Sequence, residues 1–133
     1  MDYHVLIVDD DPVVQKTLYK AIRSNGIGAD TADSGEAALA AMEKTPYDLV
    51  LMDINKGELD GFEVIQIMRQ RNLTIPVIIV SARAEDYDAL YGLDIGADDY
   101  ITKPFNPVTL GAKVKALIRR SQGKLSGDAN ILT

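Results

Sequence analysis

The sequence predicts an α/β domain in which helices cover both faces of a parallel sheet. Short runs of apolar, often β-branched residues recur along the chain, as is typical of strands buried on both faces. Segments with apolar residues at helical spacing separate these runs. Strands that alternate with helices favour right-handed crossovers, so we expect a three-layer sandwich with a five-stranded parallel sheet and five helices.

The first half of the chain shows the first three strands and two helices. In order these are a strand at 5–8, a helix after Asp11-Pro12, a weak strand near 29–32, a helix capped by Ser34 and a strand at 49–52. Aspartate followed by proline is typical of a helix start, because the carboxylate accepts a free N–H bond and proline presets the helical φ. Asn25-Gly26 should end the first helix, and Thr45-Pro46 the second.

The second half continues the alternation. In order we expect a helix at 61–70, a strand at 77–80, a less regular helix at 86–93, a strand at 100–102 and a helix opened by Asn106-Pro107. The last residues are polar and contain Gly and Ser, as is typical of linkers. We therefore expect one domain at 1–121 and a polar linker or disordered tail at 122–133.

The composition bounds the classes of function. Hydrophobic residues make up 47% of the 133 residues, which suffices for one domain with its own core. A net charge of −6 argues against nucleic-acid binding by this domain, and the lack of cysteine excludes disulfides and thiolate metal sites. The sequence has no apolar run long enough to span a membrane and no signal-peptide pattern, so a cytoplasmic location is expected.

Polar residues follow the apolar runs where the predicted strands end. Asp9 and Asp10 follow the first run, Asp53 and Ser81 follow the runs at 49–52 and 77–80, and Lys103 follows the last strand. Functional crevices of parallel sheets lie at the carboxyl ends of the strands, so these side chains should lie close together. Buried carboxylates need a cation, and a hard divalent ion is the natural candidate.

Four segments carry a resemblance to a known family. They are VLIVDDDP, LVLMDI…LDGFE, PVIIVSA and GADDYITKPF, they occur in this order, and the resemblance covers residues 4–120. With them the chain resembles the receiver domain of a two-component response regulator, most closely the winged-helix, OmpR/PhoB-like class. The resemblance implies a flavodoxin-like strand order 2-1-3-4-5.

The resemblance also implies the chemistry. Asp53 would accept a phosphoryl group from the phosphohistidine of a sensor histidine kinase. Mg²⁺ would be held by Asp9, Asp10, Asp53 and the backbone carbonyl of Asn55. A carboxylate attacks an anionic phosphate poorly, so a metal ion and a protein cation are needed to stabilise the developing charge. The domain would catalyse only its own phosphorylation and dephosphorylation.

Further roles follow from the same resemblance. Ser81 would bond a phosphoryl oxygen, and Lys103 would pair with the phosphoryl group. Pro104 would follow a cis peptide bond, and Tyr100 would be the aromatic switch residue that accompanies Ser81. A C-terminal effector domain or a separate downstream protein would receive the signal, with transcription regulation as the expected output.

Some positions depart from the family pattern. Gly57 stands where proline is usual, which should loosen the loop after Asp53. Relatives often dimerise through charge pairs on the face of the fourth helix, fifth strand and fifth helix. On that face the chain keeps Asp94, Asp98, Asp99, Lys113 and Arg120. Ala89 and Thr109 replace a usual basic and a usual acidic residue, and Gly111 replaces an apolar one, so we expect at most a weak homodimer.

Other classes share parts of this pattern. A phosphatase of the haloacid-dehalogenase type also uses an aspartyl nucleophile and magnesium, but it needs a second aspartate where this chain has Asn55. A flavodoxin-like cofactor binder needs a phosphate-binding loop after the first strand, where three aspartates would repel a phosphate. Within the family, the alternatives are a stand-alone or hybrid receiver in a phosphorelay or in protein–protein signalling, and a receiver that works without phosphorylation.

Overall fold

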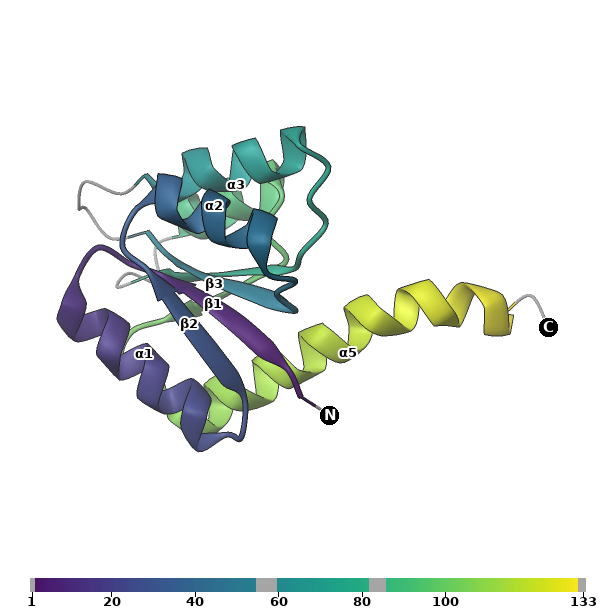
Figure 1. Ribbon diagram of the computed structural model, residues 1–133, viewed down its shortest axis with the longest axis horizontal. Helices are drawn as coiled ribbons and strands as arrows, with labels where there is room; N and C mark the ends of the chain where they lie inside the picture. The colour runs from purple at the N-terminus through teal and green to yellow at the C-terminus, as the bar shows by residue number, and fades with distance from the viewer. Residues whose placement is uncertain (1, 55–59, 82–85, 132–133) are drawn as a thin grey trace.

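Strands and helices alternate along the chain in the computed structural model, which describes residues 2–54, 60–81 and 86–131 (Figure 1). The elements are β1 (His4–Val8), α1 (Pro12–Ser24), β2 (Gly28–Ala32), α2 (Gly35–Lys44), β3 (Leu49–Asp53), α3 (Gly61–Gln70), β4 (Val77–Ser81), α4 (Asp86–Ile95), β5 (Asp99–Thr102) and α5 (Pro107–Ile131). The predicted α/β fold class is confirmed.

The strands form one parallel sheet in the order β2-β1-β3-β4-β5, as the family resemblance implied. Figure 1 shows α1 and α5 on one face of the sheet and α2 and α3 on the other. The α4 helix joins the second group, since the Phe62 ring of α3 meets the Tyr91 ring of α4 edge to face with centroids 4.9 Å apart. The three-layer sandwich is therefore observed.

The central strands are apolar because both of their faces are covered. On β1, Val5 and Ile7 pack with α1 and α5, whereas Leu6 and Val8 pack with α2 and α3. All four of these side chains are fully buried. Burial of this continuous apolar run on two faces is the main source of stability of the sheet, and it fixes where each strand ends.

The first three helices begin where the sequence predicts. The side chains of Asp11, Ser34 and Asp60 each accept an N–H bond at the start of the helix that follows. The α4 helix continues to Ile95, beyond the expected end at residue 93. The α5 helix continues to Ile131, and Figure 1 shows its last turns beyond the sheet. The polar residues 122–131 are thus helical, and a domain boundary at residue 121 stays a prediction.

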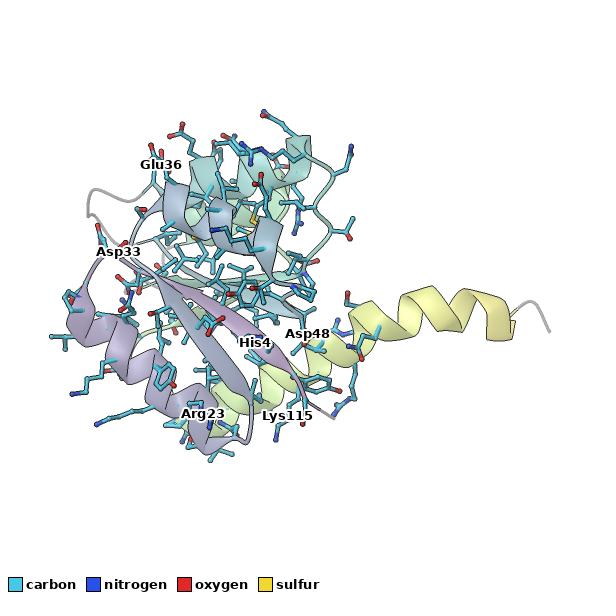
Figure 2. All side chains as sticks on the ribbon, viewed as in Figure 1. His4, Arg23, Asp33, Glu36, Asp48 and Lys115 are labelled. Carbon is cyan, nitrogen blue, oxygen red and sulfur yellow. The ribbon has the colours of Figure 1, made fainter. Side chains whose placement is uncertain are left out.

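Charged side chains lie at both ends of the sheet (Figure 2). Figure 2 shows Asp33 and Glu36 at the carboxyl end of the strands, and Arg23 and Lys115 at the opposite end. Among the described helices, none is both long enough and apolar enough to cross a membrane.

Candidate functional site

Four neighbouring strands bring the predicted site residues together at their carboxyl ends. Asp9 follows β1, Asp53 and Ser81 are the last residues of β3 and β4, and Lys103 follows β5. The parallel register places Ser81 opposite Thr102, the residue before Lys103. Asp9, Asp53 and Ser81 are the polar residues among those that the structure describes as buried. Polar groups in such a position need a specific reason, since burying them is costly.

Lys103 reaches across the sheet edge to Asp53. Its Nζ lies 2.5 Å from Asp53 Oδ2, and both side chains are largely buried. The backbone N–H of Lys103 donates to the carbonyl of Ser81 at 2.7 Å, which ties the residue to the end of β4. The Lys103–Pro104 peptide bond is cis, as predicted.

Asp9 is a buried carboxylate with one satisfied oxygen. Its Oδ1 accepts the N–H of Asp11 at 2.8 Å, whereas no described residue donates a hydrogen bond to Oδ2. Burial raises the pKa of Asp9 to about 7; the adjacent Asp53 carboxylate adds to the rise, and the Asp11 N–H and the Lys103 charge oppose it. The Asp11 N–H and the Lys103 charge therefore stabilise the ionised form of Asp9 too little to offset its burial.

A divalent cation fits this arrangement. Two buried carboxylates face a single lysine, so an additional positive charge would stabilise both ionised forms. Among the described residues, no three acidic or histidine side chains converge into a closed metal cage. Magnesium does not need such a cage, because it binds through one or two carboxylates and keeps several of its waters.

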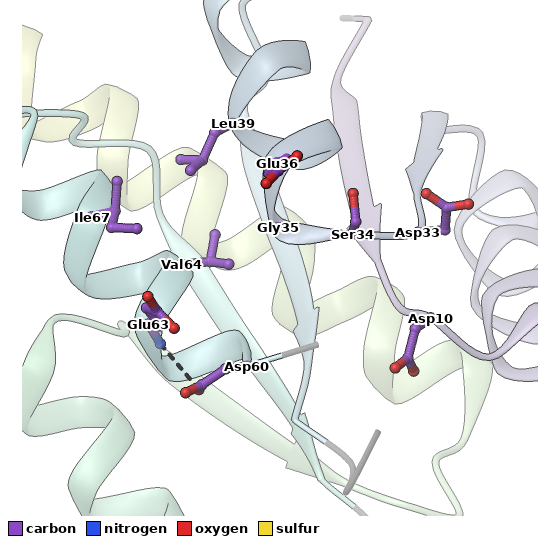
Figure 3. A pocket seen from close by; sticks show the side chains of 10 residues that line it. All are labelled: Asp10, Asp33, Ser34, Gly35, Glu36, Leu39, Asp60, Glu63, Val64 and Ile67. Carbon is purple, nitrogen blue, oxygen red and sulfur yellow. Dashed lines mark hydrogen bonds between the residues drawn. The ribbon is translucent and has the colours of Figure 1, made fainter. Parts of the chain in front are cut away.

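Asp10 lines an acidic pocket next to the site (Figure 3). The pocket has a volume of about 510 Å³ and lies between the first turns of α2 and α3. Its acidic side chains are Asp10, Asp33, Glu36, Asp60 and Glu63. A cleft lined by one sign of charge concentrates counter-ions, so this pocket favours cations beside Asp10.

Two predicted features fall partly or wholly outside the described residues. The Asn55 carbonyl and the Gly57 loop lie in the segment 55–59, which the structure does not describe. The side chain of Ala89 is likewise outside the described part of α4.

Tyr100 lies on the edge strand β5, and 39% of its surface is exposed. Lys113 of α5 donates to the Tyr100 carbonyl at 3.2 Å and has its Nζ 5.9 Å from the centre of the Tyr100 ring. Lys113 also pairs with Asp99 at 3.3 Å. Asp99 and Lys113, two of the charged residues expected on an association face, therefore form an ion pair with each other within the chain.

Sequence reasoning missed two polar side chains that make several long-range bonds. Gln15 donates to the carbonyls of Asp9 and Ala32, at the ends of β1 and β2. The Arg69 guanidinium donates to three carbonyls and to Asp98, and burial lowers its pKa. In the sequence, each of these residues is only a long polar residue within an amphipathic helix. Such residues are more often exposed to solvent, so the pattern does not indicate these contacts.

Known proteins match nearly the whole chain. The family model of the response regulator receiver domain matches residues 5–115. The alkaline phosphatase synthesis transcriptional regulatory protein PhoP of Bacillus subtilis (strain 168) is 39% identical over 122 residues, which are 92% of this chain and 51% of PhoP. The transcriptional regulatory protein PmrA of Pectobacterium parmentieri is 40% identical over 127 residues, 96% of this chain and 57% of PmrA. This chain thus spans about half the length of the curated relatives it matches.

Solved structures agree with these sequence matches. The receiver domain of the Francisella response regulator 1452 superposes with a TM-score of 0.83 at 34% identity, covering 90% of this chain and 99% of that one. A two-component response regulator from Clostridium difficile gives a TM-score of 0.80 at 33% identity, with 90% and 98% covered. The chain therefore belongs to the receiver domains of two-component response regulators.

Proposed function

We propose that Asp53 of this receiver is the phosphoacceptor and that its phosphorylation requires Mg²⁺. The observation that carries the proposal is the contact of Lys103 Nζ with Asp53 Oδ2, 2.5 Å, beside the unsatisfied Oδ2 of Asp9. A cation and a carboxylate pair at the floor of the site, and a second carboxylate is available for a metal ion. This arrangement supports phosphoryl transfer to Asp53 rather than a purely structural ion pair.

The transfer conserves all atoms of the phosphoryl group. An oxygen of Asp53 attacks phosphorus, the P–N bond to the donor histidine breaks, and the bond electrons return to the imidazole. Lys103 neutralises charge that gathers on the phosphoryl oxygens, and the Ser81 hydroxyl donates to one of them. Bound Mg²⁺, held by Asp9, Asp10, Asp53 and the Asn55 carbonyl, would neutralise further charge on the same oxygens. The product is an acyl phosphate that water can hydrolyse, so the domain acts on itself and is not an enzyme in the ordinary sense.

The donor would be the phosphohistidine of a sensor histidine kinase, and a groove beside the site supports this. The groove has a volume of about 590 Å³ and runs from Lys103 along α1. Val13, Val14, Pro104 and Phe105 give it an apolar lining, and 72% of the Val13 surface is exposed. A partner seated there would cover apolar surface next to the attacking carboxylate.

The output is proposed to be transcription regulation through a C-terminal effector domain. The relatives that match are transcriptional regulators about twice as long as the matched segment. The second candidate is a stand-alone receiver in a phosphorelay. The domain carries a net charge of −6 and should not bind nucleic acid itself, so without an effector domain it would signal through another protein. Analysis of the parent gene beyond Thr133 separates the two.

The test of the phosphoacceptor is intact-mass analysis after incubation with acetyl phosphate and Mg²⁺. We expect one added phosphoryl group on the wild type and none on Asp53→Asn, because the amide is a far weaker nucleophile than the carboxylate. Asp94→Asn is the matched control, since Asp94 is an exposed residue of α4 outside the acidic pocket and should leave phosphorylation unchanged. Equal phosphorylation of the wild type and Asp53→Asn would sink the assignment.

A further inference from the structure

The side chain of Gln15 joins the ends of two strands directly behind the acidic residues. Gln15 lies in the first turns of α1, and its side chain is partly buried. Its Nε2 donates to the carbonyl of Asp9 at 3.1 Å and to the carbonyl of Ala32 at 3.4 Å. The side-chain amide thus uses its two N–H groups on carbonyls from two neighbouring strands.

These bonds extend the sheet by one residue. The ladder between β1 and β2 ends at Val8 and Ala32, and the N–H of Asp9 makes one more bond to the Ala32 carbonyl at 3.0 Å. After Ala32 the chain turns toward α2. Among the described residues, no backbone N–H donates to the Asp9 carbonyl. The amide of Gln15 takes the place of a backbone N–H at this position, and a buried carbonyl left without a donor would be costly.

Asp9 is consequently held by contacts from three directions. Its N–H is bonded to β2, its carbonyl to Gln15 of α1, and its Oδ1 to the N–H of Asp11. The oxygen that remains is Oδ2, which is buried and receives no hydrogen bond from a described residue. Because the Asp9 carbonyl belongs to the peptide that links Asp9 to Asp10, Gln15 also orients the start of Asp10.

We infer that Gln15 is a positioning residue for the divalent cation of this site. It holds the Asp9–Asp10 peptide so that both carboxylates are in place before the cation arrives, and binding then need not order them. The inference rests on the proposed function, because it presupposes that Mg²⁺ binds at Asp9 and Asp10. A purely structural Gln15 would stabilise the fold without changing the affinity for the ion.

Calorimetric titration of the full chain with MgCl₂ separates these two roles. We expect Gln15→Met to raise the Kd for Mg²⁺ about tenfold, because methionine keeps the length of the side chain but has no N–H donors. Thr17→Val is the matched control on the same helix. It removes a side-chain bond to a carbonyl as well, that of Thr17 Oγ1 to Val13 at 2.9 Å, and should leave the Kd unchanged.

Urea unfolding without Mg²⁺ shows that each variant is folded. A wild-type Kd in Gln15→Met overturns the inference, even if that variant is less stable. Should Gln15→Met fail to fold, Gln15→Asn replaces it, because asparagine keeps the amide but is one methylene too short to reach both carbonyls; a wild-type Kd there also overturns the inference. The Asp10→Ala variant distinguishes failure of the metal site itself: if the wild type and Asp10→Ala bind Mg²⁺ equally, the proposed site and the role of Gln15 fail together.

Discussion

At the scale of single residues, the site is defined by an imbalance of charge. Asp9 and Asp53 are both nearly inaccessible, and Lys103 provides one positive charge for the two carboxylates. Burial raises the pKa of Asp9 to about 7, and the neighbouring Asp53 carboxylate adds to the rise. In the folded protein without metal, Asp9 therefore keeps its proton over a range of pH in which the unfolded chain has lost it.

This linkage predicts how stability without Mg²⁺ depends on pH. Between pH 3.8, the ordinary pKa of an aspartate, and about pH 7, the folded state binds more protons than the unfolded state, so the free energy of unfolding should fall as pH rises. In Asp9→Asn the side chain resembles the protonated acid at every pH, so the free energy of unfolding of this variant should lack the fall with pH that Asp9 causes. Above pH 7 in EDTA, that variant should exceed the wild type in stability by on the order of 4 kcal/mol, because the pKa rises from 3.8 to about 7 and each pKa unit corresponds to about 1.4 kcal/mol.

Urea unfolding of both proteins at several pH values measures the effect. Addition of Mg²⁺ should reverse the order near neutral pH, because only the wild type gains the binding free energy of the ion. A constant difference between the two proteins at every pH would contradict the assignment of the raised pKa to Asp9.

At the scale of elements, Arg69 connects parts of the chain that are far apart in sequence. Its guanidinium donates to Leu73 and Ile75 in the connection from α3 to β4, and to Gly96 in the connection from α4 to β5. It also pairs with Asp98 at 3.2 Å, whose Oδ2 accepts the N–H of Val77. The side chain thereby sets where β4 and β5 begin relative to α3.

We predict that Arg69→Met lowers the free energy of unfolding by about 3 kcal/mol, because three carbonyls and one carboxylate lose their donors. Arg71→Met is the matched control at the end of the same helix. Arg71 pairs with Glu43 at 3.2 Å on the surface, so its loss should cost less than about 1 kcal/mol. Chemical denaturation of both variants tests the difference, and equal losses would refute the role given to Arg69.

Elements whose signals are local could be predicted from the sequence. Asp11, Ser34 and Asp60 cap the helices that follow them, and a cap needs only residues within one turn. The convergence of Asp9, Asp53, Ser81 and Lys103 follows from the parallel sheet, but the strand order came from the family resemblance. The contacts that Gln15 makes with Ala32, and Arg69 with Gly96 and Asp98, could not be predicted, because these partners are distant in sequence. The end of α5 was missed because polar helical residues do not differ in pattern from a linker.

At the scale of the whole molecule, we expect the output surface to be the face made by α4, β5 and α5. The two states of the receiver would differ there, because phosphoryl contacts by Ser81 and Lys103 exist in only one of them. Tyr100 now points its partly exposed ring toward Lys113, and Lys113 is shared with Asp99. A rearrangement of Tyr100 would thus also release charges for contacts with a partner.

We predict that phosphorylation-like activation produces only weak self-association. Ala89 and Thr109 stand where the family resemblance implies a basic and an acidic residue, and Lys113 and Asp99 already pair within the chain. Sedimentation equilibrium with beryllofluoride and Mg²⁺ should show mainly monomer at low micromolar concentration. Asp53→Asn serves as the control that cannot bind beryllofluoride as the carboxylate does. A tight dimer of the wild type under these conditions would contradict the prediction, because the face would then associate without the ionic pair missing at Ala89 and Thr109.

The length of α5 gives this domain a mechanical property. The helix has 25 residues, so its axis measures about 37 Å at 1.5 Å per residue. Its first turn is anchored to α1, where Asn25 Nδ2 donates to the Pro107 carbonyl at 3.2 Å, three residues after the cis proline that follows Lys103. Leu110, Val114, Leu117 and Ile118 pack in the core, so the part of the helix that extends past it is 119–131, about 20 Å long. A tilt of about 5° where this part begins displaces the far end by about 2 Å. Small adjustments around a phosphorylated Asp53 could therefore be amplified geometrically before they reach any body attached to the far end.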